Sequence, residues 1–75
     1  ARAAVSPTSQ FQHLFEQALE CHRSGNVEKA EAAYRKLLQY YPDHTPSLVN
    51  LGVILKNRGQ YEAAIALYRR AQALD

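Results

Sequence analysis

The sequence predicts an all-α protein built from two antiparallel helix–turn–helix hairpins, and an internal repeat is the main reason. The 75 residues nearly repeat themselves at a spacing of 34 residues. The positions that agree are apolar, small or turn-forming: Leu14 with Leu48, Ala18 with Gly52, Gly25 with Gly59, Ala30 with Ala64, and Tyr34 with Tyr68. A period of this length is typical of stacked helical hairpins, which bind other molecules along a surface and rarely catalyse reactions.

Small residues occupy matched places in both halves of the chain. Ala18 and Gly52 lie in the middle of the first helix of each expected hairpin, and Ala30 and Ala64 lie early in the second. Small side chains let two helix backbones approach closely where the helices cross. A general amphipathic bundle does not need them at matched positions, so they favour a repeated hairpin.

The first hairpin is expected over residues 11–44, after a lead-in and helix start over residues 1–10. Ser6 followed by Pro7 can start the helix, with serine as the cap and proline at the first helical position, and Thr8 or Ser9 can serve as the cap instead. Apolar residues at helical spacing then continue to a Ser-Gly-Asn turn. In that turn, Gly25 suits the left-handed residue that follows the last turn of a helix.

The second helix is expected over residues 27–40. Glu28 and Glu31 lie near its start and Arg35 lies in its second half, an order that the helix dipole favours. Glu31 and Arg35 also form an i,i+4 pair of opposite charge. Pro42 cannot continue the helix, so the chain must break there.

The second hairpin is expected over residues 45–75. Thr45 followed by Pro46 repeats the order of a cap and a proline at the first helical position. The third helix should end near Gly59 and the fourth should begin near Tyr61. Connections of only a few residues imply antiparallel neighbours, and no segment alternates as a strand does.

Composition and charge argue against several classes of function. The net charge of +2 is too small to indicate a nucleic acid or an anionic membrane as partner, and Arg69 and Arg70 are expected to be solvated. No apolar run approaches the roughly 20 residues that span a bilayer. The single Cys21 cannot form an internal disulfide, which fits a reducing, cytoplasmic compartment. Because the chain lacks an initial Met and stops where the second repeat should supply a closing proline, we expect a longer parent protein.

One pattern of large, small and turn residues occurs in both halves. In the second half it comprises Leu48, Leu51, Gly52, Leu55, Gly59, Tyr61, Ala64, Tyr68 and Ala71. In the first half it comprises Leu14, Ala18, Cys21, Gly25, Val27, Ala30, Tyr34 and Pro42. This pattern resembles the tetratricopeptide repeat over about residues 11–75. Gln17 and Leu37 depart from it, and departures of this kind suit a terminal repeat with a solvent-facing side.

The resemblance implies a right-handed superhelix of hairpins, in which the first helix of each hairpin lines a concave groove for extended peptides. The residues expected in the groove are Gln12, Phe15, Glu16, Leu19, His22, Arg23, Pro46, Val49, Asn50, Val53, Lys56 and Asn57. Val49 and Val53 lie off the main apolar stripe, so they predict either a peptide groove or contact with another part of the protein. Asn50 has both a donor and an acceptor for a peptide backbone.

Two binding modes of the resembled family can be compared with these residues. Asparagines at the position of Asn50 form a ladder in the groove of protein O-GlcNAc transferases, but Glu16 stands at the equivalent place in the first repeat. Members that bind chaperones use a clamp of Lys, Asn and Arg for a terminal carboxylate. Two first-helix positions of that clamp are Phe15 and Leu19 here, which argues against such a clamp.

Catalytic, metal and cofactor sites are not expected. Adjacent residues on a helix point about 100° apart, so Cys21 and His22 do not face each other. No second cysteine lies at metal-ligand spacing, and Cys21 is expected to be inert packing. His13 and the i,i+4 pair Glu16 and Glu20 are expected to lie in solvent.

The end of the second hairpin is expected to lack cover. Each hairpin of such an array buries its apolar face against the next one, so about three repeats or a capping helix are normally needed. Ile65, Tyr68 and Leu74 should therefore be partly exposed. We expect the chain to self-associate through its C-terminal helix, as in a symmetric dimer, or to be marginally stable alone.

Three functional hypotheses stay open on the sequence alone. The first is a non-catalytic module that binds an extended peptide or a neighbouring domain in its groove. The second is the N-terminal, substrate-recruiting segment of a multidomain enzyme such as a bacterial glycosyltransferase resembling O-GlcNAc transferase. The third is an assembly unit, in which the groove of one chain receives a segment of another.

Overall fold

A computed structural model describes the backbone of residues 7–74 and the side chains of residues 10–74. The four helices in this part of the chain are α1 (Pro7–Arg23), α2 (Val27–Tyr40), α3 (Thr45–Asn57) and α4 (Tyr61–Leu74). The described residues contain no strand, and the predicted all-α class is confirmed. Of the lead-in and helix start expected over residues 1–10, residues 1–6, including the Ser6 cap, lie outside the described residues.

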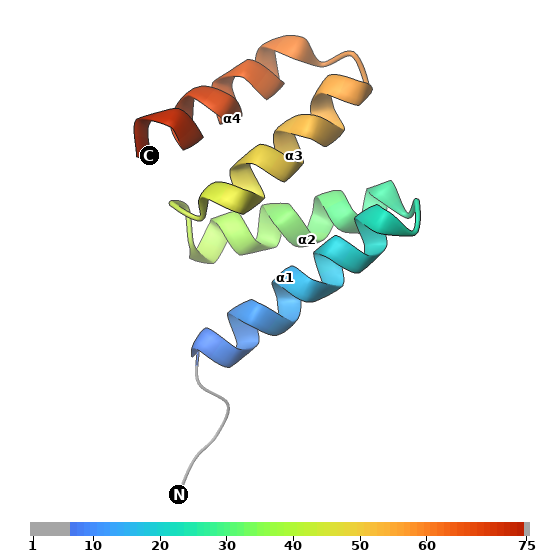
Figure 1. The fold of residues 1–75 in the computed structure, drawn as a ribbon, viewed down its shortest axis with the longest axis vertical. Coiled ribbons are helices and arrows are strands. Elements are labelled where there is room, and N and C mark those ends of the chain that lie inside the picture. Colours follow the sequence, from blue (N-terminus) through green and yellow to red (C-terminus); the bar gives the residue numbers. More distant parts are fainter. Residues whose placement is uncertain (1–6, 75) are drawn as a thin grey trace, which may run out of the picture.

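The four helices lie side by side in the order of the chain. α1 packs against α2, α2 against α3, and α3 against α4. Figure 1 shows α1 and α4 at opposite edges of the molecule, with α2 and α3 between them. The structure is therefore two helical hairpins that stack mainly through α2 and α3.

The turns within the two hairpins are alike. Gly25 has φ +89° and Gly59 has φ +81°, in the left-handed region that glycine adopts without a steric penalty. In each turn the residue after the glycine donates a backbone hydrogen bond to the carbonyl five residues earlier. These bonds join Asn26 to Cys21 at 2.8 Å and Gln60 to Leu55 at 2.9 Å. Such a bond satisfies a carbonyl at the end of the helix, so the predicted role of Gly25 is confirmed.

The core lies where the helices cross. Its buried residues are Ala18, Ala30, Tyr34, Leu37, Leu51, Ile54, Leu55 and Ala64. At Gly52 an added Cβ atom would lie 2.7 Å from Cε1 of Tyr68, so α4 approaches α3 closely at this point. The matched alanines Ala18, Ala30 and Ala64 are likewise buried.

The start of α3 differs from the prediction. Thr45 was expected to cap this helix, but Thr45 is its first residue and His44 is the cap. The Nδ1 atom of His44 accepts a hydrogen bond from the backbone N–H of Ser47 at 3.3 Å and lies 2.6 Å from the Ser47 hydroxyl oxygen. An imidazole nitrogen can act as the acceptor that an N-terminal cap supplies, and here it also satisfies the fully buried Ser47.

Candidate functional site

The residues predicted for the groove lie at helical spacing on α1 and α3. Those that are exposed are Gln12, Glu16, Arg23, Pro46, Val49, Lys56 and Asn57. Those that are half-buried are Phe15, Leu19, His22, Asn50 and Val53. The half-buried side chains are mostly apolar and the exposed ones are mostly polar. We call these residues the strip; a mixture of half-buried apolar and exposed polar side chains is typical of protein contact surfaces.

Tyr34 of α2 connects the two helices that carry the strip. Its side chain is fully buried, and its hydroxyl oxygen lies 3.5 Å from Nδ1 of His22 on α1. Asn50 on α3 donates a hydrogen bond from Nδ2 to the same oxygen at 3.3 Å. Burial raises the pKa of the Tyr34 hydroxyl, which therefore stays protonated at neutral pH. The bond fixes the Asn50 amide and leaves its carbonyl oxygen and second N–H for another partner.

His44 joins the first hairpin to the start of α3. Its ring lies edge-on to the rings of Phe11 and Phe15, with centroid distances of 4.5 and 4.8 Å. Such T-shaped pairs are favourable beyond the apolar area that they bury. Phe15, predicted as a groove residue, is therefore partly covered by the contact between the hairpins. Sequence reasoning did not single out this role of His44.

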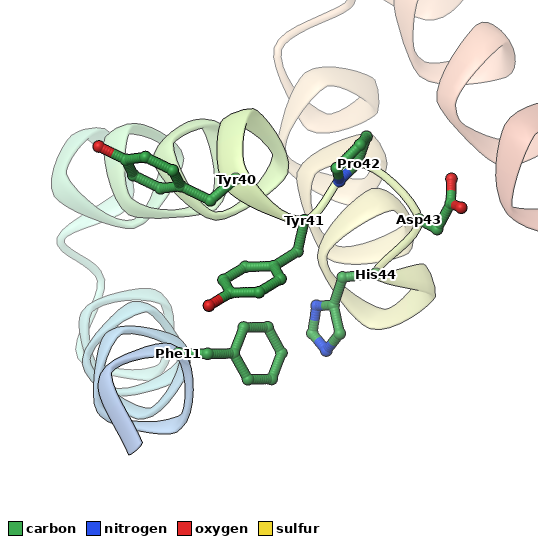
Figure 2. Close-up of a pocket in the computed structure, with 6 residues that line it drawn as sticks. All are labelled: Phe11, Tyr40, Tyr41, Pro42, Asp43 and His44. Atoms are coloured by element: carbon green, nitrogen blue, oxygen red, sulfur yellow. The ribbon is translucent and has the colours of Figure 1, made fainter. Parts of the chain in front are cut away.

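The aromatic cluster borders a shallow hollow of about 420 Å³. Figure 2 shows the rings of Phe11, Tyr41 and His44 close together, whereas Tyr40 and Asp43 point away from them. Phe11 and Tyr41 pack edge to face at 4.7 Å. Tyr40 is 64% exposed. The contacts of Phe11 with Tyr41 and His44 thus join α1 to the loop before α3 and help to hold the hairpins together.

The cap made by His44 predicts a dependence of stability on pH. Burial lowers the pKa of His44 below its ordinary value of 6.5, so the folded chain favours the neutral imidazole. The unfolded chain binds the proton more readily, so this stability is complete above about pH 6.5 and is lost as the pH falls toward the lowered pKa. Protonation would place a hydrogen on Nδ1 and a positive charge at a helix N-terminus, both unfavourable.

Thermal unfolding between about pH 8 and pH 5 measures this effect. The loss is expected to approach the roughly 0.5–2 kcal/mol that a lost cap costs. In His44→Asn, which keeps a capping side chain without a titrating group, this part of the pH dependence should disappear. His13→Asn is the matched control, because His13 is exposed on α1. Equal pH dependence in all three chains would contradict the assignment.

An ion-pair cluster forms a second link between the hairpins. Glu31 of α2 accepts a hydrogen bond from Nε of Arg35 at 3.0 Å, which confirms the predicted i,i+4 pair. Its other oxygen accepts from Arg58, at the end of α3. Burial alone raises the pKa of Glu31, but the hydrogen bonds and charges of Arg35 and Arg58 lower it by more, so the pKa is below its ordinary value. A carboxylate that is ionised and shared in this way ties α2 to the turn after α3.

The remaining candidates have structural surroundings. Cys21, expected to be buried packing, is half-buried beside the core. Arg70 was expected to be solvated; it remains exposed, and its guanidinium donates a hydrogen bond to the carbonyl of Pro42 at 3.0 Å. Within residues 7–74, no three His, Cys, Asp or Glu residues are placed to share a metal ion. None of the described helices is long and apolar enough to cross a bilayer.

Comparison with known families agrees with this architecture. The model of the family described as tetratricopeptide repeat matches residues 15–75, which include both hairpins except for the beginning of α1. The chain belongs to the tetratricopeptide repeat family. No curated protein and no solved structure matched it. Tetratricopeptide repeats generally mediate protein–protein interactions, so the apolar strip of this tetratricopeptide repeat chain is a candidate contact surface.

Proposed function

We propose that the chain is a non-catalytic interaction module that binds an extended peptide segment or a neighbouring domain along α1 and α3. The observation that carries the proposal is a set of three neighbouring residues on α3. Val49 is 37% exposed although it is apolar, and Val53, one turn later, is half-buried. Between them, Asn50 is held by the buried Tyr34 hydroxyl. An apolar pair beside a fixed amide can bury a ligand side chain and bond the ligand backbone at the same time.

The polar edges of the strip add orientation rather than affinity. Glu16 on α1 and Lys56 on α3 are both exposed and make none of the ion pairs found in the described part of the chain. Exposed charges contribute little to affinity, but they favour one direction of a bound segment over the other. A peptide with a basic residue near Glu16 and an acidic residue near Lys56 is therefore the preferred ligand.

Peptide selection followed by calorimetry tests the proposal. Peptides are selected from a random display library on the wild-type chain, and their affinities are compared for three variants. Asn50→Ala and the double variant Val49→Ser with Val53→Ser should each weaken binding at least about tenfold, which is about 1.4 kcal/mol. Gln39→Ala on α2, an exposed site away from the strip, should leave affinity unchanged.

Circular dichroism must show that the variants keep their helicity. A further control is Tyr34→Phe, which frees the Asn50 amide while leaving the ring in place. This variant should weaken binding less than Asn50→Ala does. Unchanged affinity in the Asn50 and valine variants, or failure to select any peptide, would contradict the groove assignment.

The same strip can serve inside a larger enzyme. In that second proposal, the chain recruits protein substrates for a glycosyltransferase domain further along the parent chain, and Asn50 is the residue that favours it. Deleting the two hairpins would then reduce modification of protein substrates while leaving hydrolysis of the sugar donor unchanged. A parent protein without any catalytic domain would rule this alternative out.

A further inference from the structure

The outer face of α4 carries large apolar side chains that nothing in the described chain covers. Tyr61 is 62% exposed and Ile65 is 46% exposed. Tyr68 lies on the same side, since residues spaced by four and seven share one side of a helix, and it is half-buried above Gly52. We call Tyr61, Ile65 and Tyr68 the outer face of α4. Leu74 is also exposed, but it follows Ile65 by nine residues and therefore lies half a turn away.

The first hairpin shows how the matching face is covered. The residues 34 positions before the outer face are Val27, Glu31 and Tyr34 of α2. Tyr34 is fully buried, and the Glu31 side chain is only 18% exposed where Arg58 binds it. On α4 the carboxylate is replaced by Ile65. A partner that packs on the outer face of α4 therefore needs an apolar surface opposite Ile65, where an arginine would not fit.

A head-to-tail stack of copies does not provide that surface. In such a stack, α1 of the next copy would take the place that α3 takes on the first hairpin. Where α3 presents the buried Leu51 and Ile54, α1 presents Gln17 and Glu20. Glu20 is exposed and paired with Arg23, and burying it in such a contact would cost desolvation energy.

The charges beside the outer face of α4 instead match a second copy of α4. Glu62 and Arg69 are exposed and seven residues apart, so they lie on the same flank of the helix. When two identical helices pack antiparallel, residues of the same flank meet across the contact. Glu62 of each copy then faces Arg69 of the other, and Ile65 lies near the two-fold axis. Neither residue has an ion-pair partner within the part of the chain that the structure describes.

We propose that two copies of the chain form a symmetric dimer in which their α4 helices pack antiparallel through Tyr61, Ile65 and Tyr68. Apolar burial supplies the affinity, and the two pairs of Glu62 with Arg69 set the direction of the helices. The proposal concerns a face of α4, which differs from the peptide strip on α1 and α3, and it does not depend on peptide binding.

Sedimentation velocity over a range of concentrations of the 75-residue chain tests the dimer. The wild-type chain should change from monomer to dimer as its concentration rises. Ile65→Glu should weaken the dimer at least about tenfold. This variant is expected to fold, because Glu31 stands at the same position of the first hairpin, and circular dichroism checks that it does.

Charge reversal tests the antiparallel direction. Glu62→Arg and Arg69→Glu should each weaken the dimer, and the double variant should restore the dissociation constant to near the wild-type value. Glu28→Arg is the matched control, since Glu28 is the equivalent of Glu62 on α2 and should leave the dimer unchanged. A chain that stays monomeric at every concentration, or a dimer that survives Ile65→Glu, would overturn the proposal. If the double variant dimerised more weakly than both single variants, the antiparallel direction would be overturned.

Discussion

Replacing Tyr34 with alanine is expected to leave most of the chain unfolded at 25 °C. Tyr34 is fully buried where three helices meet, and it contacts Phe15 of α1 and Asn50 of α3. Truncating a buried aromatic side chain to alanine costs about 3–5 kcal/mol. A single core of this size supplies only about 3–5 kcal/mol in total. The loss is therefore as large as the whole stability of the fold.

Urea denaturation followed by circular dichroism measures this effect, and Tyr34→Phe is the control. The phenylalanine variant keeps the ring and removes only the hydroxyl, so it should lose about 1 kcal/mol. Tyr68→Ala at the matching position of the second hairpin should cost less than Tyr34→Ala, because Tyr68 is only half-buried. If Tyr34→Ala unfolded at the same urea concentration as the wild-type chain, Tyr34 would not hold the hairpins together.

Gly52→Leu is expected to cause the second large loss, because the Tyr68 ring of α4 lies directly against α3 there. Even a Cβ atom at this position would lie 2.7 Å from the Tyr68 ring, so a leucine has no room. Overpacking of this kind costs about 1–3 kcal/mol. Gly52→Ala should lie within about 1 kcal/mol of the wild type, because alanine favours a helix by about 1 kcal/mol over glycine. Ala18, fully buried at the matching position of the first hairpin, shows that a methyl group fits a crossing of this kind.

A double variant separates the clash from other causes. Tyr68→Ala removes the ring that Gly52→Leu would strike, so the two changes together should cost less than the sum of their separate effects. Chemical denaturation of the four chains gives the coupling energy. Strict additivity would show that the leucine is accommodated elsewhere, and the close approach of α4 to α3 would then be wrong.

The regular part of the fold could be predicted because local signals agreed with each other. The second helix was expected over residues 27–40 and is found at Val27–Tyr40. Pro42, the amphipathic pattern and the order of charges all agree with a helix that ends at these residues. The left-handed Gly25 is a similar case, since few other residues adopt that conformation without strain. These features are determined by residues that lie close together in the chain, so they can be recognised from one sequence alone.

The parts that the sequence did not reveal depend on contacts between distant residues. Threonine commonly caps helices, so Thr45 was the expected cap of α3. His44 is the cap instead, because its ring also packs against Phe11 and Phe15 of α1. Likewise, Phe15 fits a groove position by spacing, yet part of its surface lies against the second hairpin. The link from Glu31 to Arg58 spans 27 residues, so no local pattern could point to it. A spacing shows which residues share a helix face, but not what packs against that face.

Nuclear Overhauser effects report directly on the contact between the two hairpins, on which the fold depends. Cross-peaks are expected between ring protons of Phe15 and His44, whose centroids are 4.8 Å apart, and between Tyr34 and Asn50. These pairs lie 29 and 16 residues apart in the chain, so only the stacked arrangement brings them together. Strong cross-peaks within each hairpin, with none between the hairpins, would contradict it.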